Sequence, residues 1–237
     1  FFEAFGFTQR TGIDLPGEAS LKDAYWSREK MTNVDLAVAS FGQRFEVTPL
    51  QMITAFAATV NGGDLVKPYV VQSVSTRDKT VAENTQPTVV RQVVSQETSQ
   101  RVSKILESVV SEGTGKNAYV AGYRIGGKTG TTNNSHDAWF CGYAGGLVAV
   151  SWMGYDNPKP LGARETGGGL ALPVWIDFMK AELKGVPEYT RVMPSSVVER
   201  DGEVFYRDPV KGAAGAFSDL LMSGRDEASE LVRDQIF

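Results

Sequence analysis

The chain has 237 residues, 42% of them hydrophobic, which is enough to bury one large core or two small ones. Its 24 basic and 28 acidic side chains leave a net charge of -4, so nothing indicates a nucleic-acid partner or an anionic membrane surface. A single cysteine, Cys141, excludes an internal disulfide, and together with a single histidine, His136, it provides too few ligands for a zinc site.

The beginning of the chain, FFEAFGF, lacks a methionine and is rich in aromatic side chains that need a packing partner. We therefore interpret the sequence as a piece cut from a longer protein. Its longest apolar runs, such as LVAVSWM over 147–153, are far shorter than the roughly 20 residues of a membrane-spanning helix. No membrane span is predicted in this chain.

The first predicted helix follows Thr48, where TPLQ combines an N-cap threonine, a proline at the first helical position and the glutamine of a capping box. This helix is expected to end at Gly62 and to be buried, because it is apolar almost all round. A strand is predicted over 66–76, and an amphipathic helix over 95–112. The docking face predicted for this second helix consists of Val102, Ile105, Leu106, Val109 and Val110, and the water-facing side of Ser103, Lys104, Glu107 and Ser108.

Short β-rich runs separated by turn residues fill 123–155, which predicts an antiparallel meander of three strands. A further helix is predicted from Pro173 to about Lys184, with Gly185 as its stop. Helix, antiparallel sheet and helix in this order are typical of an α+β fold in which the sheet is packed between helices.

The chain after this helix is expected to be peripheral. VVERDGEVFY over 197–206 predicts a hairpin that turns at Asp201 and Gly202, and a charged tail follows it. We therefore assign 1–185 to the α+β domain and 186–237 to a C-terminal appendix.

The stretch GYRIGGKTGTTNN matches two incompatible motifs at Lys128. Read as GxxxxGKT, it is the phosphate-binding loop of a nucleotide-binding protein, which requires a helix directly after the motif. The residues from Gly130 to Asn134 are poor helix formers, so this interpretation is disfavoured. Read as KTGT, the stretch is an edge strand in which Lys128 presents a positive charge and Gly130 leaves room for a ligand.

A resemblance to the C-terminal half of the transpeptidase domain of class A penicillin-binding proteins is carried by GGKTGTTNNSHDAWFCGYAGGLVAVSWMGYDNPKPLG and ETGGGLALPVWIDFM. Two earlier stretches resemble the class B members of the family more closely, FGFTQRTGIDLPGE and SFGQRFEVTPLQMITAFAATVNGGDLVKPYVV. The resemblance covers about 1–184. It implies the penicillin-binding and serine β-lactamase-like transpeptidase fold, N-terminally incomplete.

This resemblance implies a peptidoglycan D,D-transpeptidase, which forms a serine acyl-enzyme with a stem peptide ending in D-alanyl-D-alanine and also binds β-lactam antibiotics. Lys128, Thr129, Gly130 and Thr131 would bind the substrate. Lys128 and Thr131 would also be catalytic, the latter through a backbone N–H in the oxyanion hole. The family uses no metal or organic cofactor, and its members act outside the cytoplasm, anchored to the membrane in the full-length protein.

Two of the three motifs of this family are missing from the sequence. SxN occurs nowhere, and SxxK occurs once, as SREK from Ser27, where charged neighbours and a position after TGIDLPGE argue against a nucleophile. The isolated chain is therefore expected to be inactive, with the missing N-terminal segment as a required partner. Two questions stay open: whether the chain is a fragment or a recombinant, and whether it is instead a non-catalytic cell-wall peptide-binding or interaction module.

Overall fold

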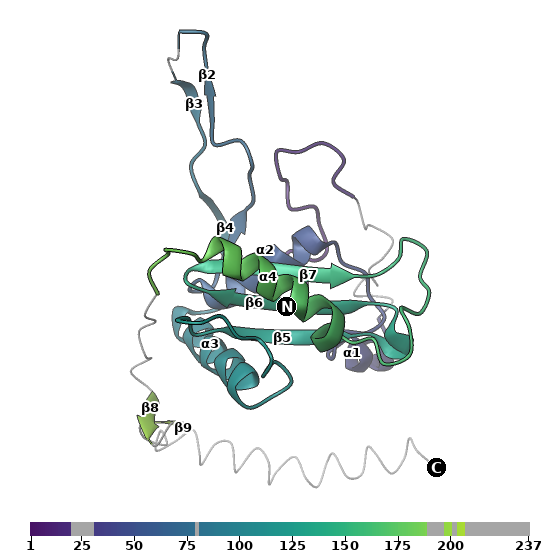
Figure 1. The fold of residues 1–237 in the computed structure, drawn as a ribbon. Coiled ribbons are helices and arrows are strands. Elements are labelled where there is room, and N and C mark those ends of the chain that lie inside the picture. The colour runs from purple at the N-terminus through teal and green to yellow at the C-terminus, as the bar shows by residue number, and fades with distance from the viewer. Residues whose placement is uncertain (20–30, 79–80, 189–196, 201–202, 207–237) are drawn as a thin grey trace, which may run out of the picture. The chain divides into compact units, whose positions relative to one another are not determined.

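The computed structural model describes residues 1–19, 31–78, 81–188, 197–200 and 203–206 (Figure 1). They belong to two compact units, Phe1–Arg191 and Val192–Phe237. Within the described residues, the first unit contains the helices and the sheet that carries the KTGT motif, and the second unit contains one hairpin.

Three antiparallel strands form the central sheet of the first unit, in the order β5-β6-β7 (Figure 1). They are β5 (Gly126–Thr131), β6 (Ala138–Ala144) and β7 (Leu147–Met153). A tight turn joins β6 to β7 at Gly145 and Gly146, whose φ angles of 54° and 82° favour glycine. The predicted meander is confirmed, and β5 lies at one edge of the sheet.

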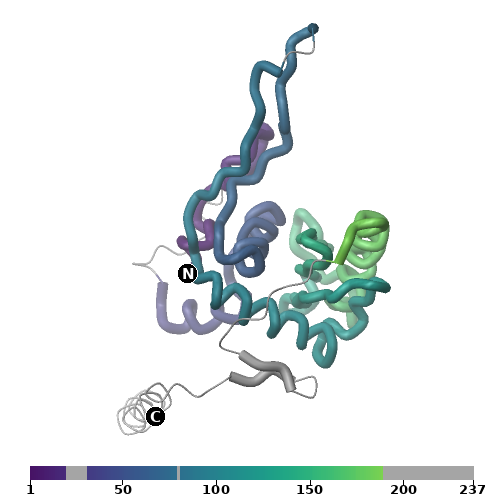
Figure 2. The backbone as a smooth tube through the Cα atoms, turned by 90° about the vertical axis from the view of Figure 1, so that its left-hand side faces the viewer, coloured from purple at the N-terminus to yellow at the C-terminus, as the bar shows by residue number. Residues whose placement is uncertain are grey.

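Helices cover both faces of this sheet, and Figure 2 shows α2 (Pro49–Val60) and α4 (Leu172–Glu182) on opposite sides of it. Helix α4 packs on the sheet through Trp175, whose ring centroid lies 5.1 Å from that of Phe140 in β6. Helix α3 (Gln96–Ser111) lies along β5. The α+β architecture of a sheet packed between helices is therefore confirmed. The core beneath α4 consists of Ala118, Val120, Ile125, Phe140, Ala144, Ala149, Ala171, Leu172, Trp175, Met179 and Leu183.

Helix α2 begins at the predicted capping box. Thr48 Oγ1 accepts a hydrogen bond from the backbone N–H of Gln51 (3.1 Å), and Gln51 Oε1 accepts one from the N–H of Thr48 (3.0 Å). Residues 50–60 are all buried or half-buried, as predicted. Helix α4 begins within one residue of its predicted start, after a single π turn, η2 (Gly167–Ala171). A short helix that the sequence did not predict, α1 (Asn33–Ala39), precedes α2.

Helix α3 occupies its predicted range, but the two faces predicted for it are partly wrong. Ser103 is 1% exposed and Ile105 is 62% exposed, the reverse of the expectation. The small side chain of Ser103 lets the helix approach the sheet closely, and the hydroxyl of Tyr143 donates a hydrogen bond to the Ser103 carbonyl (2.8 Å). Lys104 and Glu107 form a half-buried ion pair (3.0 Å) and are not solvated as expected.

Between α2 and α3 the chain forms a narrow double-stranded ribbon, which Figure 2 shows in dark blue and teal. Its four strands pair as β1 (Asp64–Lys67) with β4 (Thr88–Gln92), and β2 (Ser73–Ser75) with β3 (Val81–Asn84). The single strand predicted over 66–76 is therefore wrong. Pro68 cannot continue the ladder, and the carboxylate of Asp14 accepts the N–H groups of Val70 and Val71 (2.8 and 2.9 Å) in place of a strand partner.

The second unit contains the predicted hairpin, in which β8 (Val197–Arg200) pairs with β9 (Glu203–Tyr206). This prediction is confirmed, whereas the predicted charged tail lies outside the described residues. In the described part of the chain, no helix combines the length and the apolar character needed to cross a membrane.

Candidate functional site

The KTGT motif forms the last four of the six residues of β5. Lys128 lies opposite Cys141 of β6 and Gly130 lies opposite Trp139, so the motif is held in a regular antiparallel ladder. The element that follows is η1 (Asn133–Ser135), a single 3₁₀ turn. A phosphate-binding loop needs a helix whose N-terminus faces the anion at this point. The geometry therefore excludes the nucleotide-binding interpretation of GKT.

A groove of about 480 Å³ lies between α2 and the sheet face that carries Lys128. Its apolar walls come from α2, from the loop that precedes this helix and from strands β6 and β7, while its rim is formed by β5 and the loop that follows it. The lining residues are Phe41, Gly42, Gln43, Phe45, Glu46, Val47, Pro49, Met52, Phe56, Lys128, Thr129, Gly130, Thr131, Thr132, Asp137, Trp139, Cys141 and Trp152.

Lys128 presents an exposed ammonium group at the rim of this groove. Its Nζ donates a hydrogen bond to the carbonyl oxygen of Thr129 (2.7 Å), so the positive charge lies along the edge of the strand. The neighbouring Gly130 packs closely on β6, since a Cβ there would lie 3.2 Å from that of Trp139. Cys141 is buried beside Lys128, and this burial raises the pKa of its thiol to about 12 although the lysine charge acts to lower it. Cys141 is 8% exposed and belongs to the buried residues, and a neutral thiol is a poor nucleophile.

The two threonines of the motif project from the other side of β5, as the alternation of a strand requires. Thr129 Oγ1 donates a hydrogen bond to Thr114 Oγ1 (3.2 Å), and Thr131 Oγ1 accepts one from the backbone N–H of Gly167 (3.1 Å). A hydroxyl group has one proton and two lone pairs, so each threonine retains capacity for a ligand at the edge of the strand. The side chains of Lys128 and of the two threonines thus leave β5 on opposite sides, but all four predicted site residues line the same groove.

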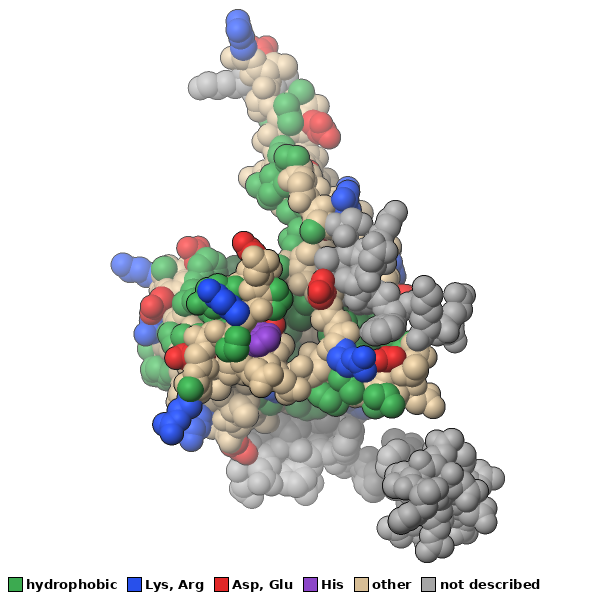
Figure 3. Space-filling model, turned by 90° about the vertical axis from the view of Figure 1, so that its right-hand side faces the viewer, with side chains coloured by type: hydrophobic (Ala, Val, Ile, Leu, Met, Phe, Trp, Pro, Cys, Tyr) green, Lys and Arg blue, Asp and Glu red, His purple; other side chains and the backbone are tan. Residues whose placement is uncertain are grey.

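Asp137 fixes the loop that follows the motif. Its backbone N–H donates to Thr132 Oγ1 (2.8 Å), and its carboxylate accepts a hydrogen bond from the indole of Trp152 (3.0 Å). Trp139 and Trp152 lie side by side in the groove, with ring centroids 5.9 Å apart. His136 ends the same loop at the surface, where Figure 3 shows it in purple. The loop therefore connects the end of the motif to the aromatic wall of the groove.

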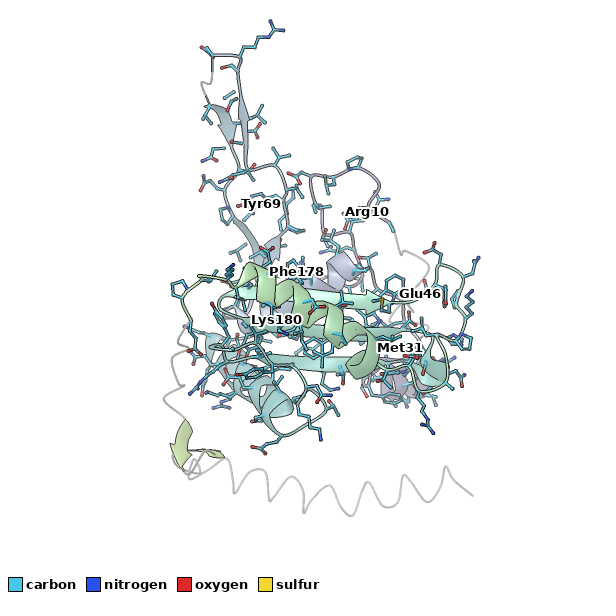
Figure 4. All side chains as sticks on the ribbon, in the orientation of Figure 1. Arg10, Met31, Glu46, Tyr69, Phe178 and Lys180 are labelled. Carbon is cyan, nitrogen blue, oxygen red and sulfur yellow. The ribbon has the colours of Figure 1, made fainter. Side chains whose placement is uncertain are left out.

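Sequence reasoning missed the loop over 41–47, which forms one end of the groove and includes Glu46 (Figure 4). Arg44 adopts a positive φ of 64° in this loop and forms an ion pair with the buried Asp35 of α1 (3.0 Å). The available signal was the pair of phenylalanines in SFGQRFE, directly before the capping box. Ser27, the disfavoured candidate nucleophile, lies outside the described residues.

Residues 1–180 match the sequence profile of the family described as penicillin binding protein transpeptidase domain. Stage V sporulation protein D of Bacillus subtilis is 39% identical over 195 residues, which are 77% of this chain and 30% of that protein. Penicillin-binding protein 1A of Neisseria gonorrhoeae is 37% identical over 168 residues, 69% of this chain and 21% of that protein. The chain thus spans less than a third of the length of these curated relatives.

Solved structures share the fold. Penicillin-binding protein 1A from Haemophilus influenzae has a TM-score of 0.67 at 24% identity, covering 86% of this chain and 35% of that chain. Penicillin-binding protein A from M. tuberculosis, solved as an imipenem acyl-enzyme complex, has a TM-score of 0.61 at 25% identity, covering 76% of this chain and 41% of that chain. Because the profile match extends over most of its length, the chain belongs to the transpeptidase family of penicillin-binding proteins.

Proposed function

We propose that this chain is the carboxylate-binding part of a peptidoglycan D,D-transpeptidase. The observation that carries the proposal is the position of Lys128: an exposed ammonium group on an edge strand, beside the side-chain-free Gly130 and at the rim of the groove. A stem peptide ending in D-alanyl-D-alanine lies along β5, with its terminal carboxylate at Lys128 Nζ. Thr129 and Thr131 supply hydroxyl groups around the same carboxylate.

In the proposed reaction a serine hydroxyl attacks the carbonyl carbon of the penultimate D-alanine. The hydroxyl proton passes through a general base to the leaving amine, the terminal D-alanine departs, and an ester joins serine to the peptide. An amine of a neighbouring stem peptide then attacks this ester, which frees the serine and forms the cross-link. The backbone N–H of Thr131 stabilises the transient oxyanion, and the loss of such a donor raises the barrier by roughly 3–4 kcal/mol.

β-Lactam antibiotics acylate the same serine in this proposal, with their own carboxylate at Lys128. The reaction needs neither a metal nor an organic cofactor, because a fixed ammonium charge and backbone N–H groups supply the electrostatic stabilisation. The enzyme works in the periplasm or at the outer face of the cytoplasmic membrane, and its full-length form is anchored there. Residues 1–185 supply the transpeptidase part, and 186–237 form an appendix.

The proposal assigns the nucleophile to a segment that this chain does not contain. No SxN sequence occurs in it, and none of the described residues that line the groove is a serine. Incubation of the chain with a fluorescent penicillin is therefore expected to give no stable label on a denaturing gel. A label that survives denaturation and disappears in Ser27→Ala would instead place the nucleophile in this chain.

Reversible binding tests the carboxylate site directly. Trp139 and Trp152 line the groove, so their fluorescence reports a peptide ending in D-alanyl-D-alanine. Lys128→Ala is expected to weaken binding by about tenfold or more, since a hydrogen bond to a charged group contributes about 1.5–3 kcal/mol. Lys180→Ala is the matched control, because this exposed lysine lies on α4 (Figure 4). Equal affinities of the two variants would contradict the proposal.

A second candidate is a non-catalytic module that holds peptide ends or another cell-wall protein. The lack of a serine among the lining residues that the structure describes favours it. The two candidates differ when a segment carrying SxxK and SxN from a penicillin-binding protein is co-expressed with the chain. Restored labelling by penicillin supports the transpeptidase, whereas a well-folded complex that binds the peptide and stays unlabelled supports the module.

A further inference from the structure

The loop after α3 is held in a compact, regular form. The backbone N–H groups of Gly113 and Gly115 both donate to the carbonyl of Val109, at 3.0 and 3.1 Å, and the N–H of Ala118 donates to the Gly115 carbonyl at 2.7 Å. Ala118 is 4% exposed and belongs to the core cluster. The loop is therefore fastened at both ends, to the helix and to the core.

Thr114 lies between the two glycines of this loop. A Cβ at Gly113 would lie 2.8 Å from the carbonyl oxygen of Val109, and one at Gly115 would lie 3.2 Å from a methyl group of Val110. Neither position has room for a side chain at ordinary contact distance. Between these two glycines, the loop presents the exposed side chain of Thr114 from a rigid support.

This side chain reaches the edge strand at the motif. Thr129 Oγ1 donates to Thr114 Oγ1 (3.2 Å), although the two residues are 15 positions apart in the sequence. A third element closes the same corner: a Cβ at Gly168 would lie 3.8 Å from Thr129 Cγ2 and 3.9 Å from the Thr114 carbonyl. The loop after α3 and η2 therefore both lie beside Thr129, and the hydroxyl proton of Thr129 points to Thr114.

We propose that Thr114 is a positioning residue of the carboxylate site, an inference that rests on the function proposed above. Without a ligand, Thr129 gives its proton to Thr114. When a carboxylate binds, Thr129 turns this proton to the ligand, and Thr114 donates its own proton to the oxygen of Thr129. The result is a series of two hydrogen bonds, from Thr114 to Thr129 and from Thr129 to the carboxylate. Both bonds point in the same direction, so each polarises and strengthens the other. Thr114 acts through Thr129 and does not touch the substrate.

The test compares a D-alanyl-D-alanine peptide that ends in a carboxylate with the same peptide ending in an amide. The ratio of the two affinities measures recognition of the carboxylate, and a merely structural role of Thr114 would lower both affinities together. Thr114→Val, which keeps the shape and removes the hydroxyl, is expected to lower the ratio about fivefold, the equivalent of one hydrogen bond of about 1 kcal/mol. Thr114→Ser restores the ratio.

Thr88→Val is the matched control, because the hydroxyl of this exposed threonine donates to a backbone carbonyl two residues away (3.3 Å) and not to the site. It leaves the ratio unchanged, and the thermal melt of each variant monitors folding. If Lys128→Ala lowers the ratio and Thr114→Val does not, the role of Thr114 is overturned while the proposed function stands. Equal loss of both affinities in Thr114→Val also overturns it. A wild-type chain that does not prefer the carboxylate overturns both proposals.

Discussion

A methyl group added at Gly167 tests how the motif strand is supported. Gly167 begins η2 directly above β5, where a Cβ would lie 2.5 Å from the carbonyl oxygen of Gly130 and closer still to that of Trp139. Both contacts are with backbone, which cannot rotate away. Gly167→Ala must therefore push η2 off the sheet and break the hydrogen bond from its N–H to Thr131 Oγ1 (3.1 Å).

The expected cost has two parts. Overpacking of a close contact costs about 1–3 kcal/mol, and the lost hydrogen bond adds about 1 kcal/mol, giving a decrease of about 2–4 kcal/mol in the free energy of unfolding. For a unit of this size the melting temperature should fall by about 5–15 °C. Urea titration followed by circular dichroism measures the change, provided that the slope of the transition is unchanged.

Gly168→Ala is the matched control at the adjacent position. Its Cβ would lie no closer than 3.8 Å to any neighbouring atom, an ordinary contact distance. The free energy of unfolding of this variant should lie within about 0.5 kcal/mol of the wild-type value, because the added methyl group meets no close contact. Equal stabilities of the two alanine variants would refute the close approach of η2 to β5.

Three further predictions concern stability and reactivity. Because burial raises the pKa of Cys141 to about 12, a thiol reagent at pH 8 should modify this residue far more slowly in the native chain than in the urea-unfolded chain; equal rates would contradict the buried site. Thr48→Ala removes the cap of α2 and should lower the free energy of unfolding, measured by urea titration, by about 1 kcal/mol. Thr88→Ala, at an exposed threonine, is the control and should change this free energy by no more than about 0.5 kcal/mol. Hydrogen bonds from the N–H groups of Val71 and Val70 lower the pKa of Asp14 below its ordinary 3.8, so their contribution to stability is present above about pH 4 and is lost as the pH falls further. Asp14→Asn should flatten this acid-side loss in urea titrations at pH 3–6, and an unchanged pH profile would argue against the contact.

The elements that could be predicted from the sequence are those whose signals are local. The start of α2 could be predicted from Thr48, the following proline and Gln51, and the turn of the meander from its glycines. Both kinds of signal are local, because helix caps and tight turns depend on neighbouring residues. The ribbon between α2 and α3 was not predictable in this way. Its strands are largely exposed and have no apolar alternation, and their path depends on Asp14, more than 50 residues away.

The same distinction applies to the site. Lys128 and Gly130 could be predicted as site residues from the sequence, because the four residues of KTGT are consecutive and lie in one strand. Thr114 was missed, since only the packing of α3 on β5 brings it to Thr129. The prediction that Ser103 faces solvent was wrong for a related reason. The helical period shows which residues share a face of the helix, but which face is buried depends on the element that packs against it.

We propose that a peptide carboxylate binds at the edge of β5, beside the ammonium group of Lys128. Titration of the isotope-labelled chain with a D-alanyl-D-alanine peptide, followed by the backbone amide signals in NMR spectra, tests it most directly. The signals of 128–131 should shift with the carboxylate peptide, shift much less with its amide, and stay in place in Lys128→Ala. Shifts confined to other parts of the chain, or equal shifts with both peptides, would contradict it.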